Sequence, residues 1–136
     1  MVTWIVVRFF APSLRAWISK APSIQGNWKY YDGEAAVGEP VGDADFRQVG
    51  RAITVKLTRR RSRTGDSYVR RFDSKGEYVD GCLQLAFEER DTRGASVGSL
   101  VLKLSSDNKT LNGLTMYFNR DKGEVVAHRI VFQKTV

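Results

Sequence analysis

The side chains of this chain that are best suited to chemistry are aromatic or cationic, and they fall in runs of alternating polarity. Alternate residues of a β-strand point to the same side, so each run can be assigned two faces. One face collects tyrosines, arginines and a threonine that we predict to line a ligand site: Tyr30, Tyr68, Arg70, Thr115, Tyr117 and Arg129. Aromatic rings stack on flat ligands, and a guanidinium holds a phosphate through paired hydrogen bonds. The set predicts a ligand with flat rings and phosphates. In the alternative interpretation, the tyrosines are rim residues with wetted hydroxyls.

Catalysis and metal binding are not predicted. The single histidine, His128, and the single cysteine, Cys82, lie far apart in the sequence and are too few for a typical zinc site. Glu88 and Glu89 are adjacent, so they face opposite sides of a strand and do not form a paired carboxylate site. We therefore expect a binding protein without a cofactor. One cysteine cannot form a disulfide within the chain, which favours a reducing, cytosolic environment.

The tripeptide Gly26-Asn27-Trp28 begins the first strand-like run. A tryptophan at this position can plug one end of a barrel, with an arginine of the last strand lying across its indole by cation–π stacking. This closure resembles that of calycin-type barrels, of which lipocalins are an example, and Arg129 is the predicted partner of Trp28. The alternative is a buried tryptophan in an unrelated β-sandwich.

The spacing of turn-forming residues predicts the strands. All three prolines lie in the first forty residues, which separates a lead-in from a region that is β-structured throughout. The predicted strands are 25–32, 46–59 (two strands divided at Gly50), 66–72, 78–89, 97–104, 110–118 and 124–133. Residues 73–76 are predicted to be a turn, and residues 33–45 a loop long enough to act as a lid. Short links and about eight strands predict an all-β, up-and-down antiparallel barrel.

The lead-in, residues 1–21, is predicted to be a helical, amphipathic segment, separate from a barrel domain at 22–136. Its aromatic and aliphatic residues are interrupted by Arg8, Arg15 and Lys20, so it is too short and too charged to be a complete membrane span. Such a segment can cap the barrel or lie at a membrane interface as a juxtamembrane stretch.

The charge balance favours an anionic partner. The 136 residues carry a formal net charge of +7 with a sequence pI near 9.8, and the run 59–63 places four arginines at a strand end. We predict an electropositive barrel mouth that attracts anions; a solvated basic surface is the alternative. No recognition helix or zinc finger is present, so sequence-specific DNA binding is not expected.

The aromatic and basic lead-in, the entry Pro22–Trp28 and the basic series of strands give the chain a family resemblance over residues 22–136. It resembles the soluble β-barrel of bacterial CBASS anti-phage effectors, in which two transmembrane helices precede a cyclic-dinucleotide receptor. The resemblance implies binding of a cyclic dinucleotide made by a partner nucleotidyltransferase (CD-NTase), followed by homo-oligomerisation and disruption of the inner membrane. It also implies that upstream helices absent from this chain hold the barrel at the cytoplasmic side of that membrane.

Two further functions remain open from the residues alone. One is a lipocalin-like carrier of a small hydrophobic or aromatic ligand. The other is a basic module that interacts with a membrane or with nucleic acid through its exterior.

Overall fold

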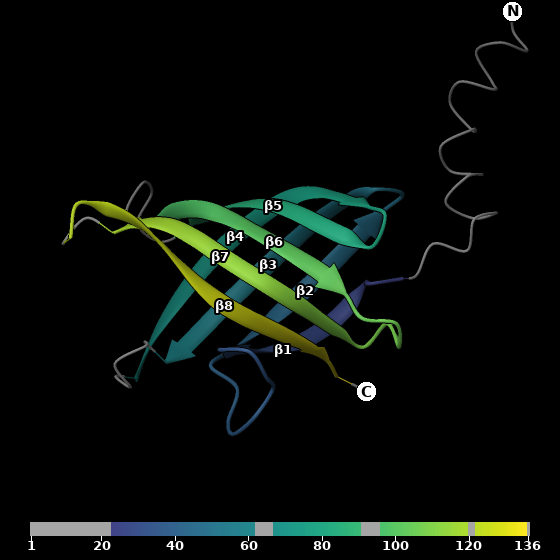
Figure 1. Ribbon diagram of the computed structural model, residues 1–136, viewed down its shortest axis with the longest axis horizontal. Coiled ribbons are helices and arrows are strands. Elements are labelled where there is room, and N and C mark those ends of the chain that lie inside the picture. The colour runs from purple at the N-terminus through teal and green to yellow at the C-terminus, as the bar shows by residue number, and fades with distance from the viewer. Residues whose placement is uncertain (1–22, 62–66, 91–95, 120–121, 136) are drawn as a thin grey trace, which may run out of the picture.

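The strands of this protein close into a barrel. The computed structural model describes residues 23–61, 67–90, 96–119 and 122–135 (Figure 1). In chain order the strands are β1 (Gly26–Asp32), β2 (Gly42–Val49), β3 (Ala52–Arg61), β4 (Ser67–Val79), β5 (Cys82–Glu89), β6 (Val97–Leu104), β7 (Thr110–Asn119) and β8 (Glu124–Lys134). Each strand pairs antiparallel with the next, and β8 pairs with β1. The predicted all-β, up-and-down barrel is confirmed.

The barrel has two distinct ends. We call the end where β1, β3, β5 and β7 begin the closed end, and the end where these strands finish the open end, which lies at the left in Figure 1. The lead-in predicted at 1–21 falls outside the described residues. Within the described part of the chain, no helix is long and apolar enough to cross a membrane.

The turn predicted at 73–76 is wrong, because β4 continues through it to Val79. The chain instead reverses at Asp80-Gly81, where both residues have positive φ (50° and 83°), as a tight Asp-Gly hairpin turn requires. Ser74 is a small, inward-facing residue of the strand, and so is Gly76, and neither marks a turn. The first loop is also shorter than predicted, since β2 already begins at Gly42.

Glycine occupies inward positions where neighbouring strands approach most closely. Four glycines are of this kind: Gly42, Gly76, Gly98 and Gly113. A β-carbon built on them would lie 2.1, 1.7, 2.1 and 1.8 Å, respectively, from a carbonyl oxygen of the neighbouring strand. Glycine inside a strand commonly marks a sharp bend or a close backbone approach, and both help a sheet to curve shut. These positions therefore contribute to barrel closure.

A stack of aromatic rings fills the closed half of the barrel. Trp28 is fully buried, and its indole N–H donates to the Ile24 carbonyl at 2.9 Å. The ring of Phe46 lies 5.4 Å from that of Trp28 and 5.5 Å from that of Phe132, whose ring is in turn 5.4 Å from Tyr30. The rings therefore form a continuous core from the tryptophan plug to the middle of the barrel.

A cation from the last strand lies near Trp28, but it is not Arg129. Lys134 places its Nζ 5.8 Å from the centre of the indole ring, within cation–π range. Strand pairing explains this, because Lys134 is the residue of β8 opposite Trp28. Arg129 is on the outer face of β8, where its side chain is 64% exposed and its Nε lies 3.2 Å from Glu34 Oε1. Both faces of β8 carry apolar residues, so alternation alone did not determine which face points inward.

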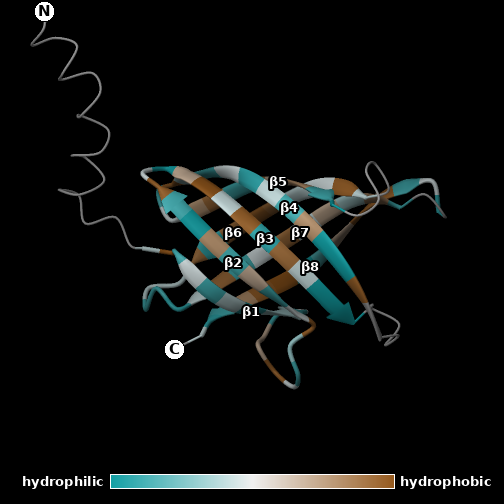
Figure 2. Ribbon diagram, turned by 180° about the vertical axis from the view of Figure 1, so that it is seen from behind, coloured by the Kyte–Doolittle hydropathy of each residue, from teal (hydrophilic) through white to brown (hydrophobic). Residues whose placement is uncertain are grey.

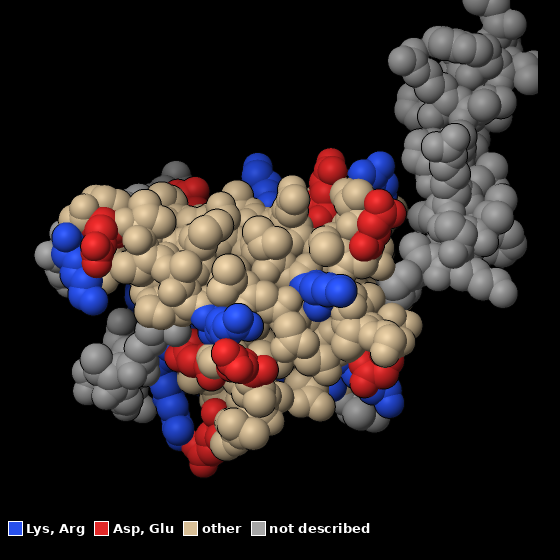
Figure 3. All heavy atoms as spheres, viewed as in Figure 1, with Lys and Arg blue, Asp and Glu red and all other residues tan. Residues whose placement is uncertain are grey.

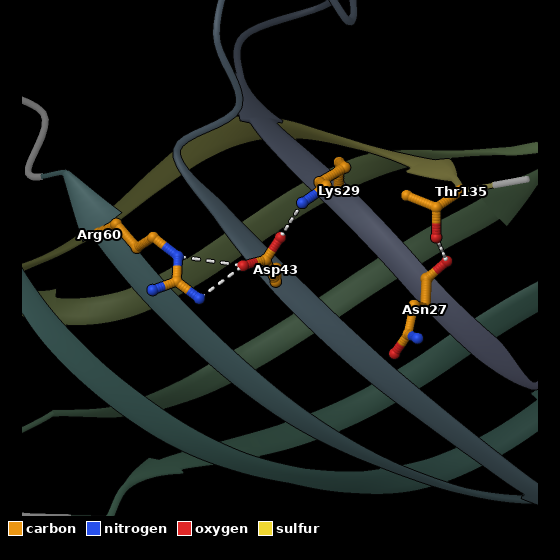
Figure 4. Close-up of polar contacts among 5 residues, drawn as sticks. All are labelled: Asn27, Lys29, Asp43, Arg60 and Thr135. Atoms are coloured by element: carbon orange, nitrogen blue, oxygen red, sulfur yellow. Dashed lines mark hydrogen bonds and ion pairs between the residues drawn. The ribbon is translucent and has the colours of Figure 1, made fainter.

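The exterior of the barrel divides into a charged side and an apolar side. On β1–β3, Asp43 accepts hydrogen bonds from Lys29 Nζ at 2.6 Å and from Arg60 Nε at 3.0 Å (Figure 4). Viewed from this side, β2 and β3 alternate between hydrophilic and hydrophobic residues along their length (Figure 2). On β6–β8, by contrast, large apolar side chains are exposed. The upper part of that face is largely uncharged in Figure 3.

Candidate ligand-binding pocket

A cavity of about 110 Å³ opens inside the barrel, between the aromatic core and the open end. Apolar residues from several strands form one part of its wall, and tyrosine, threonine, serine and arginine side chains form the other. The lining residues are Tyr30, Leu57, Arg59, Arg70, Phe72, Phe87, Ser96, Leu100, Thr115, Tyr117 and Ile130. The cavity is thus amphipathic, and every strand except β2 contributes to its wall.

The first ion pair of the pocket joins the end of β3 to the end of β1. Arg59 donates to both carboxylate oxygens of Asp32, from Nη1 at 3.1 Å and from Nη2 at 2.6 Å. Only 11% of the Arg59 side chain is exposed. Burial acts to lower the pKa of this guanidinium, but the hydrogen bonds and charge of Asp32 outweigh it and raise that pKa above its usual value. Arg59 therefore carries its charge at every physiological pH.

Gly42 makes room for the ring of Tyr30. It lies between Tyr30 of β1 and Arg59 of β3 in the pairing of the strands. A β-carbon at Gly42 would approach the Tyr30 ring to 2.5 Å. The missing side chain lets the tyrosine ring take its place in the wall of the pocket, which Arg59 also lines.

The second ion pair joins β4 to β5. Arg70 donates to Glu89 from Nε at 2.9 Å and from Nη2 at 2.8 Å, and its guanidinium lies 5.1 Å from the centre of the Phe72 ring. The Glu89 side chain is only 9% exposed. Its hydrogen bonds to Arg70 hold the pKa of the Glu89 carboxyl below its usual value, although burial acts to raise it. Both partners are therefore charged near neutral pH.

The two ion pairs leave this part of the pocket electrically balanced. Arg59 and Arg70 supply two positive charges, while Asp32 and Glu89 supply two negative ones. Each guanidinium makes two hydrogen bonds to its carboxylate, which is the geometry that would otherwise hold a ligand phosphate. An anionic ligand would have to displace a carboxylate from one of these arginines.

The arginine run that was predicted to make the mouth electropositive forms ion pairs where the structure describes it. Arg60 pairs with Asp43 at 2.8 Å, and Arg61 pairs with Glu39 of the first loop. Together with Arg59, each arginine of the run that the structure describes has a carboxylate partner. The first loop, predicted to be a lid, has no residue in the cavity lining.

Four of the six predicted site residues, Tyr30, Arg70, Thr115 and Tyr117, meet in the cavity. Arg129 does not, since it lies on the outer face of β8. Residue 68 belongs to β4, but its side chain lies outside the described part of the structure. The predicted closure residues Gly26 and Trp28 are at the closed end, away from the cavity.

Sequence reasoning missed three charged residues of the site: Asp32, Arg59 and Glu89. Alternation contained a signal for two of them. Arg59 continues the inward series of β3, and Glu89 continues that of β5. Arg59 was considered only as part of the arginine run at the mouth, and Glu89 only as an unsuitable partner for Glu88 in a paired carboxylate site.

The comparisons with known proteins found similarity to solved structures, and that similarity is one of fold. No protein-family model and no curated protein matches the chain. It is similar to lobster apocrustacyanin A1 at 12% identity and a TM-score of 0.46, over 90% of this chain and 68% of that one. It is also similar to apocrustacyanin C2 at 12% identity and a TM-score of 0.47, with the same coverage. The description of this protein as a closed eight-stranded barrel rests on its own strand pairing.

Proposed function

We propose that this protein binds one small, flat, uncharged molecule inside the open half of its barrel. The observation that carries the proposal is an amphipathic cavity whose two arginines are already neutralised by Asp32 and Glu89. This corresponds to the carrier function that the sequence left as an alternative.

The size of the cavity limits the ligand. A dry apolar cavity of about 150 Å³ accommodates benzene, whereas pockets for drug-sized molecules measure about 300–1,000 Å³. At about 110 Å³, the cavity suits a single ring or a short chain. Phe72 and Phe87, whose rings pack edge to face with centres 5.7 Å apart, offer aromatic surface to such a ring.

The polar side chains of the cavity indicate which polar group the ligand carries on its ring. Thr115 and Tyr117 line the cavity, and the hydroxyl group of each can donate or accept a hydrogen bond. A ligand with one hydroxyl, carbonyl or amide group on its ring would match them. A charged ligand would gain less, because the guanidinium groups nearby are paired.

A cyclic dinucleotide is the second candidate, and the two arginines with Tyr30 and Tyr117 favour it. Its two bases and two phosphates are far larger than the cavity, so it would lie across the open end with at most one base inside. Binding would also require Arg59 or Arg70 to exchange its carboxylate for a phosphate.

The test is ligand-observed NMR and calorimetry on the full chain. The panel consists of indole, phenol and benzamide, the matching ring carboxylates, and a set of cyclic dinucleotides. We expect the neutral rings to bind, and Thr115→Phe, which fills the cavity, to abolish binding. Met116→Phe is the matched control, because Met116 is the next residue and points outward. Thermal unfolding of both variants establishes that each is folded.

Tight binding of a cyclic dinucleotide, with no binding of the neutral rings, would replace the proposal with the receptor function. Absence of binding across the whole panel by folded protein would refute both.

A further inference from the structure

The outer side of β6, β7 and β8 carries a continuous group of exposed apolar residues, which we call the apolar face. It consists of Val97, Val101, Leu114, Met116, Phe118 and Val125, which are 37–69% exposed. Strand pairing makes them neighbours: Val101 lies opposite Leu114, and Phe118 lies opposite Val125. Between these pairs, Met116 lies opposite Ala127, also an exposed residue. The face is therefore one patch that spans three strands.

A patch of this kind indicates that another apolar surface binds to it. Scattered apolar residues are normal on a protein surface, but contiguous groups are uncommon on monomers and usually mark an interaction site. The other side of the barrel, by comparison, is held by ion pairs such as Lys29–Asp43 and Arg90–Asp73. The contrast between the two sides points to the apolar face as a docking surface.

We infer that residues 1–22 of the same chain dock on the apolar face. Large apolar residues recur in this segment three or four positions apart, the spacing of one side of a helix. They are Trp4, Val7, Phe10, Leu14, Trp17 and Ile18. Arg8, four positions after Trp4, and Arg15, three positions before Ile18, lie along one edge of this stripe, where their long side chains can extend to solvent. The segment thus offers an apolar stripe that matches the face in chemistry.

The entry point of the chain places the segment within reach. The carbonyl of Ser23, the first described residue, accepts a hydrogen bond from Lys134 Nζ at 3.2 Å. Lys134 is near the end of β8, the strand that carries Val125 at its other end. That length of strand measures roughly 30 Å, and 22 residues in a helix extend roughly 33 Å. A segment that turns back along the barrel from Ser23 therefore reaches the whole face.

Tethering favours this occupant over a second copy of the chain. A segment joined to the barrel through a short connection is present at an effective concentration of about millimolar. A second copy at micromolar concentration competes poorly with it for the same apolar surface. Pro12 would bend a helix at the middle of the segment, which suits a curved barrel wall.

The test uses the full chain with Cys82→Ser and a single bimane label at Met116→Cys. Tryptophan quenches bimane only near contact, and Trp28 is enclosed in the closed end. We expect quenching that is independent of protein concentration and is lost in the Trp4→Phe/Trp17→Phe variant. The matched control carries the label at Lys56→Cys, an exposed position on the charged side of the barrel, and should show no such change.

A second measurement uses trypsin cleavage after Arg8, Arg15 and Lys20. Met116→Asp should accelerate cleavage in this segment, whereas Lys56→Asp should leave its rate unchanged. Quenching that grows with protein concentration would assign the face to a second copy and overturn the inference. Equal bimane emission at positions 116 and 56, with equal cleavage in both aspartate variants, would also overturn it.

Discussion

At the residue scale, the site is defined by two partly buried ion pairs that supply polarity without net charge. Arg59–Asp32 and Arg70–Glu89 are each joined by two hydrogen bonds. Removing one member of a buried pair is costly mainly because its partner is left without compensation. The pairs therefore keep the arginines in place and also restrict which ligands can use them.

Glu89→Ala should lower the free energy of unfolding by about 1–3 kcal/mol, because Arg70 loses both of its hydrogen bonds to that carboxylate. Urea denaturation at pH 7 measures the change. Glu88→Ala is the matched control, since Glu88 is exposed on the outer face of the same strand. Equal effects of the two substitutions would contradict a structural role for the ion pair.

The same ion pair predicts that the free energy of unfolding depends on pH in the acidic range. The pKa of Glu89 is lower in the folded protein than its ordinary value of 4.5, so its stabilising contribution is present above that value. The contribution is lost as the pH falls through the lowered pKa. The difference in unfolding free energy between wild type and Glu89→Gln should therefore be constant from pH 7 to pH 5 and shrink below pH 4.5. A difference that stays constant down to pH 3 would contradict this.

Much of the residue-level site could be predicted from the sequence, but its electrostatics could not. Alternation placed Tyr30, Arg70, Thr115 and Tyr117 on the inward face because their strands have one clearly apolar side. It failed for Arg129, where both faces of β8 are apolar and only the pairing with β1 sets the register. The ion pairs depend on contacts between separate strands, which no single run of sequence reveals.

At the element scale, small inward residues shape the barrel wall. The residues at 73–76 resemble a turn in composition, yet they belong to the middle of β4. The true turn is Asp80-Gly81, which was hidden inside a long strand-like run. The boundaries of β6 were predicted correctly, because a clear turn cluster follows its regular alternation.

Gly76→Ala should destabilise the barrel by about 1–3 kcal/mol, the usual cost of overpacking. Its new β-carbon would lie 1.7 Å from the Gln84 carbonyl oxygen, so the backbone of β4 or β5 must move. Thermal and urea unfolding give the change.

Ser74→Ala is the matched control on the same face of β4. Within the described residues, Ser74 Oγ is a buried oxygen without a hydrogen-bond partner. Removing it should leave the stability unchanged or raise it slightly, because the oxygen is desolvated without compensation. A larger loss for Ser74→Ala than for Gly76→Ala would contradict the role given to close strand approach.

At the scale of the whole molecule, the barrel is asymmetric both along its axis and around it. The closed end is filled by aromatic rings and crossed by Lys134, while the open end holds the cavity. Around the axis, ion pairs mark the exterior of β1–β5, whereas the apolar face lies on β6–β8. Barrel closure was predictable from strand number and the Gly-x-Trp entry. The size and neutrality of the cavity were not, because they depend on how side chains pack across the barrel.

The most direct test of the central claim is amide chemical-shift mapping of the full chain with indole or phenol. If a small neutral ring binds inside the open half, the saturable shifts will centre on the amides of Thr115, Tyr117 and Leu100, and Arg129 on the outer face will change little. Shifts that centre on the apolar face, or no saturable shifts at all, would contradict binding inside the barrel.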